Sequence, residues 1–81
     1  MANPIIASVN DARSHFAHHS YISSLITAYD NAQTPSEQEQ AMVKLAEAIS
    51  GALPSADVSQ LLESANTLLL ESNLQQELSD S

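Results

Sequence analysis

Three histidines within five residues form the densest group of side chains that could do chemistry. His15 and His19 are spaced i and i+4, so one face of a helix would carry both imidazoles. They could then share a metal ion with Asp11 as a third ligand, and His18 is a further candidate ligand. The residue after His15 is not glutamate, so the pattern of a zinc hydrolase is absent. Because solvated polar histidines are the commoner case, we expect no bound metal and no other cofactor.

The same histidines also extend a heptad pattern of apolar residues. After His15, the a and d positions are occupied by His18, Ile22, Leu25 and Tyr29. This seam predicts self-association with a second copy of the chain. Protonation of imidazoles near pH 6 would place charge in that contact and weaken it, so a pH-responsive protein is an alternative function.

The rest of the sequence lacks the patterns of catalytic sites. A single glycine is too few for the Gly-x-Ser-x-Gly nucleophile elbow or for the glycine-rich loops that bind phosphates and dinucleotides. The absence of cysteine removes thiolate nucleophiles and thiolate metal sites. A chain of 81 residues also has little volume for an enclosed substrate pocket. We therefore expect that the protein is not an enzyme.

The charge balance narrows the classes of partner. Ten acidic and two basic residues give a net charge of −8. Nucleic acids and anionic membranes are recognised by cationic surfaces, so we expect neither as a partner. The sequence also shows no apolar run long enough to span a membrane and no basic segment typical of a signal peptide. We expect a cytoplasmic protein.

Apolar residues recur at helical spacing through nearly the whole chain, which predicts an all-α domain. Prolines at three positions divide the chain into segments, as proline favours helix starts. We expect a small three-helix domain, or a long helix plus a helical hairpin, whose core is completed by dimerisation. The predicted helices are roughly 9–33, 35–51 and 55–78, after an arm of residues 1–7 and before a frayed tail of residues 79–81.

Capping residues locate three of the predicted helix ends. Ser8 is followed three residues later by Asp11, and Thr34 is followed by Pro35 and Glu37, which are patterns of helix starts. Gly51 is predicted to end the second helix in a left-handed conformation. The two halves of the first predicted helix have apolar faces about 120° apart. Either the chain breaks around residues 17–20, or one long helix packs its ends against different partners.

Three leucines lie on the polar side of the last predicted helix. Leu70, Leu74 and Leu78 repeat every four residues, nearly opposite the apolar stripe that begins at Val58. A break at residues 72–73 would turn them back toward the core. A straight helix would leave them exposed, and contiguous exposed apolar surface is typical of an interface.

Exposed leucines with neighbouring carboxylates predict a surface that binds a protein partner with basic residues at its rim. We expect a regulatory adaptor or inhibitor that acts by occluding this partner. The alternatives are a structural subunit of a larger assembly and the metal-responsive or pH-responsive protein considered above. The expected contact residues are Leu70, Leu74 and Leu78, with an acidic rim of Glu63, Glu71 and Glu77.

Overall fold

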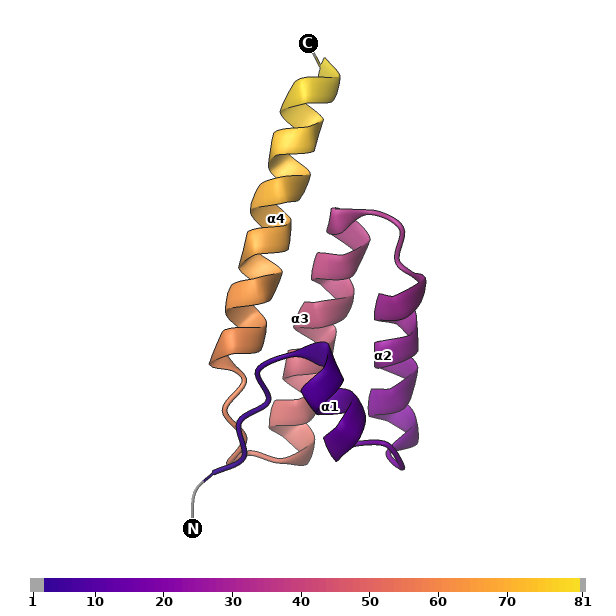
Figure 1. The fold of residues 1–81 in the computed structure, drawn as a ribbon, viewed down its shortest axis with the longest axis vertical. Helices are drawn as coiled ribbons and strands as arrows, with labels where there is room; N and C mark the ends of the chain where they lie inside the picture. Colours follow the sequence, from indigo (N-terminus) through magenta and orange to yellow (C-terminus); the bar gives the residue numbers. More distant parts are fainter. Residues whose placement is uncertain (1–2, 81) are drawn as a thin grey trace.

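Four α-helices form most of the computed structural model, which describes residues 3–80 (Figure 1). In this part of the chain the only β-type pairing is an isolated bridge between Ile5 and Asp57. The all-α class is therefore confirmed, with four helices where three were predicted. The helices are α1 (Val9–His15), α2 (Ser20–Asn31), α3 (Pro35–Ala52) and α4 (Ser59–Asp80).

The predicted single helix over residues 9–33 is wrong, because the chain breaks between α1 and α2. α1 ends at His15, and α2 begins at Ser20 after a four-residue turn. Of the two alternatives left open by the sequence, the break is the one that the structure adopts. Its physical reason is burial, since the turn lets both apolar faces reach the same core. The buried residues that it brings together are Val9, Ala12, Ile22 and Ile26.

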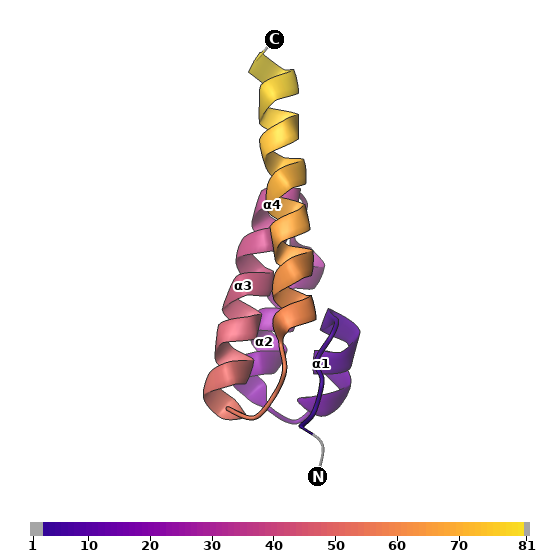
Figure 2. The ribbon, with the colours of Figure 1, turned by 90° about the vertical axis from the view of Figure 1, so that its left-hand side faces the viewer.

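α3 lies at the back of the bundle and packs against α2 on one side and α4 on the other (Figures 1 and 2). The short α1 occupies the front, opposite α3, and contacts α2. Since α1 has only 7 residues, it covers only the lower part of this fourth side. The upper part of the bundle is therefore open at the front.

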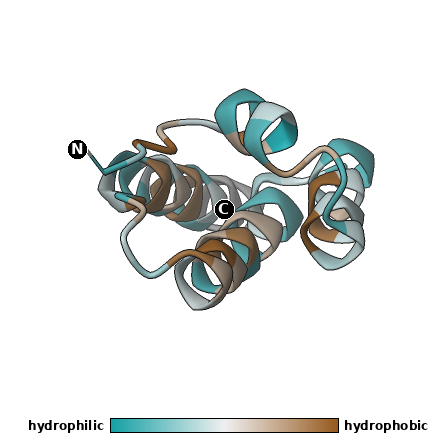
Figure 3. Cartoon of the chain, turned by 90° about the horizontal axis from the view of Figure 1, so that it is seen from below, coloured by the Kyte–Doolittle hydropathy of each residue, from teal (hydrophilic) through white to brown (hydrophobic). Residues whose placement is uncertain are grey.

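The interior of the bundle is apolar. Viewed along its length, the hydrophobic segments of α2, α3 and α4 face the space between the helices, whereas much of α1 is hydrophilic (Figure 3). No buried polar side chain occurs within the described part. The most deeply buried large side chains are Ile6, Ile22, Leu45, Ile49 and Leu61.

The segment before α1 is fixed to the loop that precedes α4. The backbone N–H of Ile6 donates to the carbonyl oxygen of Asp57 at 2.9 Å, and the N–H of Asp57 donates to the carbonyl oxygen of Pro4 at 2.9 Å. The Ile6 side chain is fully buried, so the described part of the predicted arm, residues 3–7, contributes to the core. At the other end, α4 continues to Asp80 and includes two residues of the predicted tail.

Both predicted N-terminal caps are present. The Ser8 hydroxyl oxygen accepts the N–H of Asp11 at 3.2 Å, and the Thr34 hydroxyl oxygen accepts the N–H of Glu37 at 3.2 Å. The Asp11 carboxylate in turn accepts the N–H of Ala7, just before the cap, at 3.2 Å. Each of these two helices therefore begins where its side chains satisfy free backbone donors.

The predicted left-handed cap at Gly51 is wrong. No glycine in the described part of the chain has a positive φ, and Gly51 lies inside α3, which runs on to Ala52. The helix ends there because Pro54 disfavours the helical conformation at Leu53, whose φ is −141° and ψ 84°. Gly51 therefore has no conformational role that requires glycine.

Replacing Gly51 by alanine should stabilise the protein. A Cβ at this position meets no atom within 4 Å, and alanine loses less backbone entropy than glycine in a helix. We expect Gly51→Ala to raise the free energy of unfolding by about 0.5 kcal/mol, measured by urea unfolding monitored by circular dichroism. A loss of stability would mean that Gly51 adopts the left-handed conformation after all.

Candidate functional site

The C-terminal part of α4 carries the most exposed leucines of the described chain. α4 is continuous through residues 72–73, so the break that would have buried these leucines does not occur. The helix extends past the turn between α2 and α3 (Figures 1 and 2). Leu70 is 64% exposed and Leu74 is 57% exposed. The third predicted contact, Leu78, lies in α4 outside the part whose side chains are described.

Carboxylates flank these leucines without any cation on the same helix. Glu63 lies seven residues before Leu70 and eleven before Leu74, so the three residues share one face of α4. Glu63 and Glu71 are both exposed. The sequence has no lysine, arginine or histidine after Lys44, and α4 is therefore purely acidic. Glu77, the remaining residue of the predicted rim, lies outside the described side chains.

A second set of partly exposed leucines lies on another side of α4. Leu62 is 44% exposed and Leu69 is 42% exposed, and their spacing of seven residues places them on one side of the helix. Leu62 lines a shallow hollow with Val58 of the loop and Ala46 of α3. By their helical spacing, Leu62 and Leu69 belong to the apolar stripe that begins at Val58. In the structure, these two leucines lie at the edge of the stripe, which α3 covers only in part. The spacing of apolar residues in the sequence does not indicate how far a neighbouring helix covers the stripe.

An open hollow of about 520 Å³ lies where α1 leaves the front of the bundle uncovered. Val9 of α1, Met42 of α3 and Leu61 of α4 are among its apolar lining residues. All three side chains are more than 90% buried, so the hollow is a depression in the surface above the core. Its polar lining includes an ion pair between α1 and α2.

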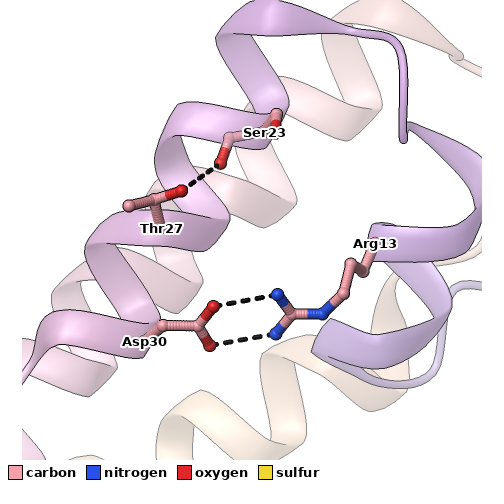
Figure 4. A network of polar contacts seen from close by, with 4 residues as sticks. All are labelled: Arg13, Ser23, Thr27 and Asp30. Carbon is pink, nitrogen blue, oxygen red and sulfur yellow. Dashed lines mark hydrogen bonds and ion pairs between the residues drawn. The ribbon is translucent and has the colours of Figure 1, made fainter.

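This ion pair joins Arg13 of α1 to Asp30 near the end of α2 (Figure 4). The two terminal nitrogens of the guanidinium each donate to one carboxylate oxygen at 2.9 Å, which is a bidentate geometry. The hydrogen bond from Arg13 lowers the pKa of Asp30, and the bond to Asp30 raises the pKa of Arg13. Because both side chains are solvent-exposed, the pair orients α1 more than it stabilises the fold.

The loop before α4 holds a second carboxylate that is stabilised in its charged form. Asp57 accepts the N–H of Ser59 at 3.0 Å and the Ser59 hydroxyl at 2.7 Å. These two hydrogen bonds lower the pKa of Asp57. They also satisfy a free backbone donor at the start of α4.

The histidine cluster falls in the turn between α1 and α2, so its predicted i, i+4 helical geometry does not occur. His15 ends α1, and His19 is the extended residue that precedes α2. Among the side chains that the structure describes, those of residues 3–74, no three histidines, aspartates or glutamates lie close enough to hold a metal ion. The candidate ligands Asp11, His15, His18 and His19 therefore do not form a site in this structure.

The predicted self-association seam is also interrupted by this turn. His18 lies in the turn and is exposed, whereas Ile22 is fully buried in the core of its own chain. Within this fold the Ile22 side chain has no exposed surface for a second copy to contact, and self-association through the seam stays a prediction. Leu25 and Tyr29 are half-buried and pack against the same core. The apolar spacing of this segment reflects packing within the chain.

Acid should destabilise the fold through Asp30 and Asp57. Their pKa values are lowered in the folded protein, so their stabilising effect is complete above the ordinary value of 3.8 and is lost as the pH falls through the lower folded values. We expect the urea midpoint to fall between about pH 5 and pH 2. The urea midpoint of Asp30→Asn should be lower than that of the wild type at neutral pH and should fall less in acid. An acid dependence equal to that of the wild type would contradict a role for Asp30.

Comparison with known proteins gives no family from which a function could be proposed, so any proposal is based on the structure of the chain itself. The chain matches no protein family, no curated protein and no solved structure. No helix within residues 3–80 combines the length and the apolar character that a membrane crossing requires. The feature of the described chain that departs most from an ordinary small domain is the projecting, leucine-bearing end of α4.

Proposed function

We propose that the protein is a small acidic binding module that acts as a regulatory adaptor or inhibitor by covering part of a protein partner. The observation that supports this most directly is the pair Leu70 and Leu74, which are 64% and 57% exposed on one face of a projecting helix. Burying the exposed parts of these two leucine side chains against a partner would contribute about 2 to 4 kcal/mol before the costs of association. This is enough to make the leucines the centre of an interface.

The acidic character of α4 favours a basic partner. Glu63 and Glu71 are exposed beside the leucines, and no basic side chain of α4 offsets their charge. A partner with lysine or arginine residues around an apolar groove would match this arrangement in both hydrophobicity and charge. The charges would mainly accelerate association and select the partner, while the leucines would supply most of the affinity.

A second copy of the chain matches this surface less well. Pairing two α4 helices through Leu70 and Leu74 would bring two acidic surfaces together, with a net charge of −8 on each chain. Like charges at an interface oppose association, most strongly at low ionic strength. We therefore favour binding to a basic protein over dimerisation or assembly into larger structures.

The shape of α4 suggests how the partner is engaged. The helix continues beyond the bundle, so a groove on a partner could receive its apolar face without contacting the other helices (Figure 1). Helices that bind in this way present apolar anchors at spacings of three, four and seven residues. Leu70 and Leu74 have the four-residue spacing, and Leu78 continues it in the sequence. Occupation of such a groove would block any other ligand of the same groove, which is the inhibitory action that we propose.

The proposal is tested by capture with the immobilised full chain and a surface variant. Leu74→Glu places a charge at an exposed position, so the fold should be retained, and circular dichroism would verify this before use. We expect proteins retained by the wild type to be reduced at least tenfold by Leu74→Glu. The retention of a basic partner should also weaken as the salt concentration rises.

Tyr21→Glu is the matched control, because Tyr21 is 62% exposed on α2, away from the leucines of α4. It introduces the same charge at a similarly exposed position and should leave retention unchanged. Equal losses with both variants would indicate a general effect of charge and would contradict the proposed surface. Sedimentation of the chain alone separates the alternative, because a dimer that Leu74→Glu dissociates would assign the leucines to self-association.

A further inference from the structure

The cap of α2 differs in chemistry from the caps of α1 and α3. Nδ1 of His19 accepts the backbone N–H of Ile22 at 3.3 Å, and the extended backbone of His19 has φ −97° and ψ 104°. α1 and α3 are capped by the hydroxyl groups of Ser8 and Thr34. Hydroxyl groups do not change charge near neutral pH, whereas an imidazole does. The α2 cap is therefore the one of these three that a proton can remove.

The hydrogen bond to Ile22 requires a neutral imidazole. Nδ1 can accept only while the ring proton lies on Nε2, because a protonated imidazole carries hydrogen on both nitrogens. Protonation would turn the acceptor into a donor that faces the N–H of Ile22. It would also place a positive charge at the N-terminus of α2, where the helix dipole is itself positive. Both effects oppose the folded conformation of this turn.

The surroundings of His19 leave this effect uncompensated. The hollow beside the ring is lined by residues 14–19, whose other titratable members are His15 and His18. Within the described chain, the one ion pair joins Arg13 to Asp30, so no carboxylate lies at ion-pairing distance from His19. The ring of Phe16 packs edge-on to His19, with the ring centres 6.0 Å apart.

Three charged residues of α3 line other hollows. Glu37 and Lys44 line a hollow with Leu25 between α2 and α3, and Glu47 lines the hollow beside Leu62. None of the three lines the hollow around the histidines. The other two imidazoles are therefore the titratable side chains that line this hollow with His19, and no carboxylate lines it.

We infer that the turn between α1 and α2 is a pH-sensitive switch, whose folded conformation is stabilised by the His19 cap while the imidazole is neutral. Ile22 is fully buried, so its capped N–H links the start of α2 directly to the core. The same turn connects α1, which packs against α2 and covers the lower front of the bundle. When His19 takes up a proton, the first turn of α2 frays and α1 loosens from the core. This exposes the apolar side chains of Val9 and Ala12, which α1 otherwise buries.

The test compares thermal unfolding at pH 7.5 and pH 5.5 for the wild type and His19→Asn. Asparagine caps a helix with an amide oxygen that does not titrate, so it keeps the acceptor and removes the proton. We expect the melting temperature of the wild type to fall by about 2 to 6 °C more than that of His19→Asn between these two pH values. Asp30 and Asp57 remain ionised throughout this range because their pKa values are lowered from 3.8, so they contribute no difference.

Two further variants locate the effect at His19. His19→Ala should melt lower than the wild type at pH 7.5, because it lacks the cap at any pH. The double variant His15→Asn/His18→Asn should retain the pH dependence of the wild type. The Ile22 amide should exchange hydrogen faster at pH 5.5 in the wild type than in His19→Asn at the same pH. The proposed switch is ruled out if the melting temperature of His19→Asn keeps the full pH dependence of the wild type. It is also ruled out if the Ile22 amide is equally protected from hydrogen exchange in both proteins at pH 5.5.

Discussion

The packing of α3 against two neighbours is the constraint on which the rest of the structure depends. α3 supplies the largest share of the buried core residues and lies between α2 and α4. Its 18 residues span about 27 Å, whereas the 22 residues of α4 span about 33 Å. α4 also runs antiparallel to α3 and extends beyond its start (Figure 1). The C-terminal end of α4 therefore extends beyond the helix that covers its apolar side.

Local chemistry made the starts of α1 and α3 predictable from the sequence. Ser8 and Thr34 cap α1 and α3 with hydroxyl groups, and the residues that mark such caps lie within three positions of each other. Gly51 shows the limit of this approach, because a glycine near a helix end is compatible with two conformations. Pro54 ends α3 without any left-handed residue. For the segment that contains α1 and α2, the sequence left two alternatives open, a break or one long helix. The periodicity shows the apolar face of each half, but it does not show whether one core can bury both faces.

The candidate site was predictable where exposure followed from the pattern of one helix. Leu70 and Leu74 lie opposite the buried stripe of α4, so a straight helix alone determines their exposure. Leu69 lies at the edge of that stripe, and its exposure depends on how much of α4 the neighbouring helix covers. Ile22 is the converse case, because the spacing typical of an interface also describes a residue buried within the chain. These distinctions arise from tertiary packing, which the periodicity of one helical segment does not describe.

The two proposed features occupy opposite ends of the bundle and use different physical interactions. α4 continues past the turn between α2 and α3, whereas His19 lies at the start of α2, near the other end of the bundle (Figure 1). A proton on His19 acts through the cap of α2, and none of the residues around it belongs to α4. Loosening of α1 would remove one cover of the core while α3 and α4 stay packed together. Binding through α4 and the response to pH should therefore be separable by mutation, and a loss of one without the other would identify the surface responsible.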